Sequence, residues 1–351
     1  MIGILGLGAS FPPDVRTNAW WPPEVVARWS ANRPPLPVAP AAASEGVRRV
    51  VAAMSAQALD PFQGARERRV APAEDSAIDL GERASRMAIE RAGIDPAQID
   101  LVLMFTVVPD VLLSNPAAIL HHRLGLSPTC LALQTEAAAY SFLAQLALAE
   151  AMVAAGRARV ALLVQASIAT RFVAPDDPGS PLFGDGATAV IVGPVSRDRG
   201  IEATAHFTDG RYPDGLVMSV PGGCWFDQGR PLIHNKNPAQ MREVFLSTAD
   251  VCKDGIDAVL AKTAHTIDDV DFLCVFQGTP WLREVVHDYI GATGCRSVEL
   301  FSQFGYMAAA MIPANLYLAE QQGVLRDDDL VVLTGGGTGV TYGATLLRWG
   351  R

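Results

Sequence analysis

An apolar, strand-like stretch at residues 131–133 runs through a series of small residues into a long helical pattern. In that pattern, apolar positions recur at helical spacing from Phe142 to Met152. A strand that ends in small residues before a helix presents one side chain at the buried start of that helix, where the helix dipole favours negative charge. Position 139, where such a segment would present a reactive side chain, is an alanine.

Buried strands and helices alternate along the rest of the chain. Apolar runs predict strands at residues 2–7, 101–108, 159–165 and 188–192, and a pair of strands within 330–348. Asp75 and Ser76 precede apolar positions with a helical period and Gly93 follows them, which predicts a capped helix between these points. This alternation indicates an α/β protein with helices packed on a sheet.

The N-terminal part contains segments that depart from this alternation. Residues 15–19 predict a turn. Prolines then break any regular element between residues 22 and 60, except for a helical pattern at 45–59, so this segment is expected to be an insertion that forms a surface flap. The prolines are Pro22, Pro23, Pro34, Pro35, Pro37 and Pro40. The Arg-Glu-Arg-Arg sequence at 66–69 predicts a solvated basic rim, with an anion site as the alternative.

An internal repeat divides the chain. Residues 99–106 and 270–277 follow the same apolar pattern, and each comes after an Ile-Asp turn, at 94–95 and 267–268. The repeat predicts two similarly folded halves, residues 1–195 and residues 196–351, which pack together.

Composition limits the classes of function. The chain has 351 residues, half of them hydrophobic, and a formal net charge of −9, which argues against non-specific binding to nucleic acid. No apolar run reaches the roughly 18 residues that span a bilayer. The five cysteines are scattered, without a paired spacing, so they predict neither disulfides nor a zinc site. We therefore expect a cytoplasmic protein that does not interact with membranes.

Other motifs argue against phosphate-loop and metal chemistry. The glycine-rich stretch at 335–343 follows a strand, but no lysine and no helix come after it, so it does not predict a phosphate-binding loop. Its glycines favour close backbone approach instead. His121 and His122 are adjacent and cannot form the usual metal-binding pair one helical turn apart. We expect no metal and no bound cofactor.

Taken together and in order, several motifs give the chain a strong resemblance to the ketoacyl-ACP synthase III branch of the thiolase-fold condensing enzymes. The motifs are Val-Arg-Thr-Asn-Ala at 15–19, Gly-Ala-Arg-Glu-Arg-Arg at 64–69, Ala-Gly-Ile-Asp at 92–95, Phe-Gly-Asp-Gly-Ala at 183–187 and the glycine-rich stretch at 335–343. The resemblance implies an α/β thiolase fold, with two βαβαβαββ halves in a five-layered αβαβα architecture. It also implies a homodimer.

The resemblance further implies a catalytic Cys-His-Asn triad, and this chain departs from it at every position. The cysteine falls on Ala139, the histidine on Phe276 and the asparagine on Tyr306. A thiolate is needed to take the acyl group, and imidazole and amide groups are needed to stabilise the enolate. Decarboxylative condensation through an acyl-cysteine is therefore predicted to be absent.

The candidate pocket consists of residues around these substituted positions. Its members are Glu136, Tyr140, Ser141, Gln277, Tyr306, Gly336 and Gly337. Ser141 is a poor substitute nucleophile, because two positions on a helix turn a side chain about 200° away. Tyr306 is able to donate a hydrogen bond to a thioester carbonyl, with simple filling of space as the alternative. Glu136 is either a general base, or it belongs to an interface or supports the residues that line the pocket.

Three functions remain open, and they differ in whether bonds change. The first is direct acyl transfer from a thioester in specialised metabolism, helped by proximity. The second is a catalytically silent partner of a cysteine-containing ketosynthase, and the third is a thioester-binding module. All three imply acyl-carrier protein or a CoA thioester as partner, and a homodimer or heterodimer. Whether the chain is an enzyme is thus left open.

Overall fold

The computed structural model describes the whole chain and contains two larger mixed sheets. The first sheet has the order β1 (Ile2–Ser10), β7 (Gly186–Pro194), β6 (Ala161–Ser167), β4 (Leu101–Thr106) and β5 (Leu131–Gln134). The second has the order β11 (Phe272–Val275), β12 (Leu330–Gly337), β13 (Thr341–Arg348) and β8 (Gly200–Thr208). In both sheets parallel pairs adjoin antiparallel ones.

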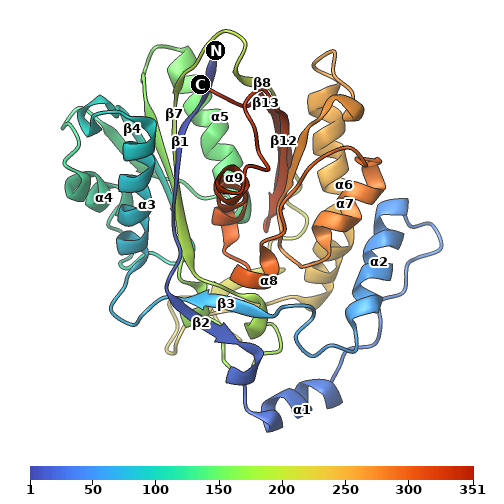
Figure 1. Cartoon of the computed structure of the whole chain (residues 1–351). Helices are drawn as coiled ribbons and strands as arrows, with labels where there is room; N and C mark the ends of the chain where they lie inside the picture. The colour runs from blue at the N-terminus through green and yellow to red at the C-terminus, as the bar shows by residue number, and fades with distance from the viewer.

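Helices separate and cover the two sheets, giving the predicted five layers (Figure 1). Helices α5 (Ser141–Ala154) and α9 (Met311–Gln321) lie between the sheets, where their apolar side chains form one core with both. The outer faces are covered by α3 (Ala77–Ala92) and α4 (Pro116–Leu124) on one side, and by α6 (Pro238–Leu260) and α7 (Leu282–Ile290) on the other. Helix α5 is apolar nearly all round, and the first part of the helix, from Ser141 to Leu146, is its most buried part.

Shorter elements complete the chain. They are the strands β9 (Leu216–Ser219) and β10 (Leu232–Asn235), which pair with each other, and the short helix α8 (Phe301–Phe304). All five cysteines are free. No helix combines the length and the apolar character needed to cross a membrane. The division of the chain into two domains, residues 1–195 and residues 196–351, remains a prediction.

The N-terminal region is more ordered than its sequence suggests. Residues 15–19 are not a simple turn, because strand β2 (Asp14–Thr17) pairs with β3 (Glu67–Val70). Within the proline-rich segment, α2 (Glu45–Gln57) confirms the helical pattern, and Val50 on it is fully buried against α6 and α7. Helix α1 (Pro23–Ala31) was missed, although proline fits the first turn of a helix, where its lack of an N–H costs nothing.

The basic sequence at 66–69 is only partly a solvated rim, because Arg66 is exposed but Arg68 is fully buried. Its guanidinium donates hydrogen bonds to the carbonyl oxygen of Pro181 at 2.9 Å and to Asn18 Oδ1 at 2.9 Å. It also lies 4.8 Å from the centre of the Trp21 ring. Burial lowers the pKa of Arg68 to about 10. The side chain joins the β2–β3 ribbon to the loop before β7, which is a structural role.

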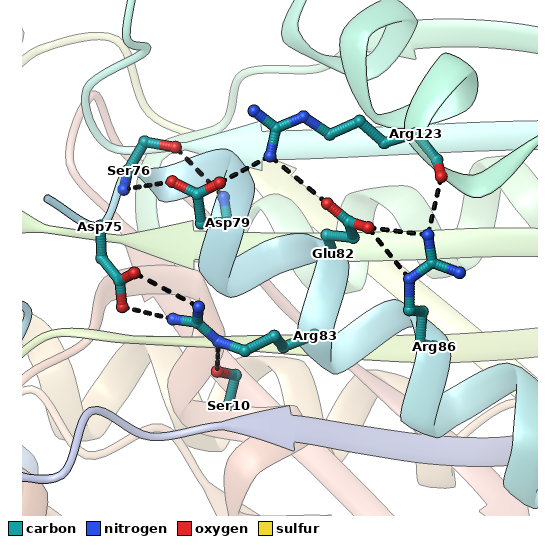
Figure 2. A network of polar contacts seen from close by, with 8 residues as sticks. All are labelled: Ser10, Asp75, Ser76, Asp79, Glu82, Arg83, Arg86 and Arg123. Carbon is teal, nitrogen blue, oxygen red and sulfur yellow. Dashed lines mark hydrogen bonds and ion pairs between the residues drawn. The ribbon is translucent and has the colours of Figure 1, made fainter.

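The predicted cap of α3 is confirmed and belongs to a larger polar network (Figure 2). Ser76 and Asp79 exchange hydrogen bonds in a capping box, at 2.7 and 3.1 Å. Arg123 of α4 donates to Asp79 at 2.6 Å and to Glu82 at 3.3 Å, which ties the two helices together. Although partial burial opposes the effect, the hydrogen bonds from Arg123 and Ser76 lower the pKa of Asp79 to about 2.

We expect the Arg123→Gln variant to lose about 0.5–1 kcal/mol of free energy of unfolding at pH 7. Because the pKa of Asp79 is depressed in the folded state, this contribution is present above the unfolded-state pKa of about 3.9 and is lost as the pH falls toward 2. Urea unfolding at pH 7, 5 and 3 measures it. Arg157→Gln, on an exposed arginine outside the network, serves as the control, and a loss that is undiminished at pH 3 would contradict the assignment.

Candidate functional site

The centre of the site is the turn between β5 and α5. Residues Ala138–Tyr140 form a 3-10 turn that leads directly into the helix, and Ala139 is buried. Ala138 has a φ of 49°, a left-handed conformation that costs an alanine roughly 1–2 kcal/mol. Ala308, in the corresponding turn before α9, also has a φ of 49°. Both halves therefore keep a strained turn at the start of the central helix, as functional sites commonly do.

The end of β12 lies against the turn at Ala139. A Cβ atom at Gly337 would lie 2.5 Å from the carbonyl oxygen of Ala137 and 3.0 Å from the backbone nitrogen of Ala139. No other residue fits there without moving the turn. Gly336 and Gly337 also line a cavity. The glycine-rich stretch, which was predicted to approach another backbone closely, therefore lies against the turn at Ala139 and also forms part of the candidate site.

Three aromatic rings meet beside the turn. Tyr306 makes edge contacts with Phe276 and with Phe183, each with ring centres 5.7 Å apart. The backbone of Tyr306 is fixed because its N–H donates to Leu182 O at 2.7 Å, while its carbonyl accepts from Gly184 N at 3.0 Å. No protein group hydrogen-bonds the Tyr306 hydroxyl. Burial raises its pKa, so the hydroxyl stays protonated and is able to donate.

Two cavities share Tyr306 and Phe183 as walls. The central chamber has a volume of about 330 Å³ and is lined by Phe276, Tyr306 and mainly apolar residues of α6. The inner recess has a volume of about 180 Å³ and contains Ala139 and Glu136 in its wall. Phe183, Leu216, Ile233, Tyr306 and Thr338 line both. A group in the chamber and a group in the recess would therefore meet at Tyr306.

A third cavity, the outer vestibule, connects the proline-rich segment to the site. It has a volume of about 410 Å³ and is lined by Arg28, Trp29 and Arg33, together with residues of α2. Trp29 Nε1 donates to Asp176 O at 2.7 Å and thereby fastens α1 to the loop before β7. The vestibule shares Gln63, Pro178, Leu182, Phe245, Thr279 and Trp281 with the central chamber. The insertion is thus part of the wall of the cavity system.

Glu136 is the carboxylate at the inner recess. Its Oε1 accepts a hydrogen bond from the backbone N–H of Ala138 at 2.6 Å, and it forms no ion pair. Glu136 as a whole is exposed to solvent in the single chain. Atoms packed around its carboxyl group nevertheless remove part of the water from that group. This desolvation raises the pKa of Glu136, and the hydrogen bond from Ala138 only partly offsets it.

Three of the predicted pocket residues have structural roles and line none of these cavities. Ser141 is buried and its Oγ accepts from Ala137 N at 2.9 Å, which holds the turn. The Tyr140 hydroxyl lies 2.6 Å from His206 Nδ1 on β8. Gln277 is buried, and its amide bonds to Val298 O at 2.7 Å and to Leu300 N at 3.0 Å. None of the three side chains is free to act on a ligand.

The structure also adds polar groups that sequence reasoning missed. Thr279 is 7% exposed and lies between the vestibule and the central chamber, and its Oγ1 has no hydrogen-bond partner. Gln57, in the vestibule wall, has an unpartnered Oε1. Thr279 stands only three positions after Phe276, but no sequence signal shows that its hydroxyl is left unpaired.

Descriptions of known protein families match several parts of the chain. Residues 133–210 match 3-oxoacyl-[acyl-carrier-protein] synthase III, and residues 260–349 match its C-terminal domain. Residues 50–166 match the N-terminal domain of thiolase. The matches include the turn at Ala139, Phe276 and the glycine-rich end of β12.

Individual relatives agree with this result. The β-ketoacyl-[acyl-carrier-protein] synthase III of Geobacillus kaustophilus is 32% identical over 289 residues, covering 82% of this chain and 88% of the relative. The synthase III structure from Thermus thermophilus superposes with a TM-score of 0.80 at 26% identity, covering 99% of both chains. A priming β-ketosynthase of a polyketide pathway has a TM-score of 0.80 at 24% identity, with 99% of this chain and 96% of that one covered, and shows the same fold. The chain belongs to the β-ketoacyl-ACP synthase III family, with the thiolase fold.

Proposed function

We propose that this chain binds an acyl thioester in the central chamber and transfers the acyl group directly to an acceptor, without an acyl-cysteine. The observation that carries the proposal is the meeting of two cavities at the free, protonated hydroxyl of Tyr306, beside an alanine that cannot attack. The equivalence of Ala139, Phe276 and Tyr306 with the family's triad is part of the proposal. So are an acyl-carrier protein or CoA thioester as donor, and a place in specialised metabolism.

The proposed step uses groups of this chain in defined roles. The acceptor's nucleophilic atom forms a bond to the thioester carbonyl carbon, and the Tyr306 hydroxyl donates to the oxygen as negative charge develops on it. Glu136 takes the proton that the acceptor loses. The carbon–sulfur bond then breaks, and the thiolate leaves and takes up a proton. Holding both reactants together replaces the covalent intermediate. No bound cofactor or metal is required by this step.

A second function is favoured by one surface feature. Strand β5 is an edge of the first sheet, and its Leu131 and Leu133 are 47% and 43% exposed in the single chain. An unpaired apolar edge strand favours association with another chain. This supports assembly as a homodimer, or as the silent partner of a cysteine-containing ketosynthase. A cytoplasmic location is part of the proposal and does not rest on this feature. A thioester-binding module without turnover is the remaining alternative.

The first test is turnover of acyl-CoA and acyl-carrier thioesters with a panel of amine and alcohol acceptors. We expect release of free thiol that depends on the acceptor. Tyr306→Phe should lower kcat by about 100-fold, because removing one donor to a developing oxyanion typically costs that much. Tyr342→Phe, on a partly exposed tyrosine of β13, should leave kcat unchanged. Activity that appears only when a cysteine-containing homologue is added would favour the silent partner instead.

The second test asks whether the protein itself becomes acylated. After incubation with the same thioesters, intact-mass spectrometry should show no acyl adduct, because the position at the turn is an alanine and the Ser141 hydroxyl is engaged by Ala137 N. A cysteine-containing homologue, treated in the same way, provides the positive control. A stable adduct on any residue of this chain would overturn the direct mechanism.

A further inference from the structure

We propose that a proline-rich segment of one copy of this chain packs against an exposed aromatic turn of a second copy. The segment, residues 33–40, is called the proline strap, and the turn, residues 224–227 between β9 and β10, is called the aromatic tip. The inference concerns assembly and does not depend on acyl transfer, so it stands or falls separately from the proposed function.

The proline strap has little conformational freedom. It contains Pro34, Pro35, Pro37 and Pro40, and it forms no helix, strand or turn. Proline fixes its own φ at about −65° and restricts the residue before it to extended conformations, so Val38 is the only residue of the strap that neither effect restrains. Such a run favours a polyproline II helix, which loses little entropy when it binds to a partner.

Hydrogen bonds hold the strap at the surface near both of its ends. Arg33 donates to Leu59 O at 2.6 Å, and Ser44, just beyond the strap, donates from Oγ to a carboxylate of α6 at 2.5 Å. Between these points the segment runs along the outside of the molecule from α1 to α2 (Figure 1). Leu36 and Val38 are 56% and 74% exposed. The strap is therefore a fixed, apolar and accessible segment.

The aromatic tip is a closed β-turn that presents two large rings. The N–H of Asp227 donates to Cys224 O at 3.3 Å, and Asp227 Oδ2 accepts from Cys224 N at 2.7 Å. Trp225 and Phe226 occupy the two central positions of this turn and are 57% and 70% exposed. Their ring centres lie 5.7 Å apart in an edge contact. Aromatic rings held in this way are typical of binding surfaces.

The strap and the tip are complementary in chemistry and in charge. Segments in the polyproline II conformation bind to surfaces that are lined by aromatic rings. Arg242 of α6 donates to Val38 O at 3.4 Å and forms no ion pair, so it places a positive charge beside the strap. Asp227 forms no ion pair and places a negative charge beside the rings, while Arg230 donates to a backbone carbonyl. Opposite charges beside the two surfaces favour and orient their association.

A second copy of this chain fits as the partner, because one chain carries both surfaces and no hydrogen bond or aromatic contact joins them within it. Two copies that exchange both contacts form a closed pair, whereas copies that share only one contact continue as a chain. Two aromatic rings bury roughly 300–500 Å² at most. The contact is therefore small, and we expect weak association that depends on concentration.

Sedimentation velocity of the full chain over a hundredfold range of concentration tests the proposal. We expect the sedimentation coefficient to rise with concentration, and we expect Trp225→Ala or Val38→Asp to weaken this association at least tenfold. Val15→Asp on β2 adds the same charge at another exposed valine and serves as the control. A coefficient of the unmodified chain that does not change with concentration would overturn the proposal and leave the strap to a different protein.

Asp227→Asn tests the contribution of charge, because its amide oxygen is still able to accept from Cys224 N and so preserves the turn. We expect this variant to associate more weakly and with a smaller dependence on salt. Asp14→Asn, on an exposed aspartate of β2, should behave like the unmodified chain. Association of Asp227→Asn with unchanged salt dependence would overturn the assigned charge pairing.

A mixture of variants shows which surfaces meet. Trp225→Ala keeps an intact strap and Val38→Asp keeps an intact tip, so an equimolar mixture should regain association that neither variant shows alone. Thermal unfolding verifies that both variants are folded. Association of Val38→Asp but not of Trp225→Ala would mean that tip binds tip, and a mixture that stays unassociated would exclude contact between strap and tip. Either result would overturn the proposal.

Discussion

The close approach of β12 to the turn before α5 is the constraint on which the site depends. Gly337 belongs to the second sheet and Ala139 to the helix start that follows the first, and only a residue without a side chain allows their backbones to approach this closely. The contact fixes how the two halves of the chain meet. It therefore also fixes where the walls of the recess and chamber, including Tyr306 and Thr338, lie relative to Ala139.

The turn before α5 keeps a strained backbone although the buried residue at its centre, Ala139, is an alanine. An alanine gains nothing from a φ of 49° at the residue before it, yet the conformation is the same in both halves. Phe276 and Tyr306 pack edge to face beside the turn and form walls of the cavities there. Packed rings make the site rigid, while the free tyrosine hydroxyl keeps one hydrogen-bond donor in it. Under the proposed function, this donor is the group that acts on the thioester oxygen.

Much of this arrangement follows from local patterns, and the remainder depends on contacts between distant segments. The alternation of strands and helices, the cap at Ser76 and the small residues of the turn are local, so the sequence predicts them. Arg68 looked like a surface residue because nothing nearby indicates that Trp21 and Asn18 would enclose it. Gln277 looked available because the carbonyl of Val298, its partner, is distant in sequence. The walls of the cavities likewise come from separate parts of the chain.

Under the proposed function, the absence of a covalent nucleophile changes what the cavities have to do. An acyl-enzyme lets two substrates use one binding site in turn, whereas direct transfer requires both at once. A single narrow tunnel would not allow this. Here the recess, the chamber and the vestibule adjoin in series, and the vestibule is built largely by the inserted segment around α1. Under the proposed function, the insertion adds volume on the side from which a carrier-bound donor would extend, while the acceptor lies deeper in the site.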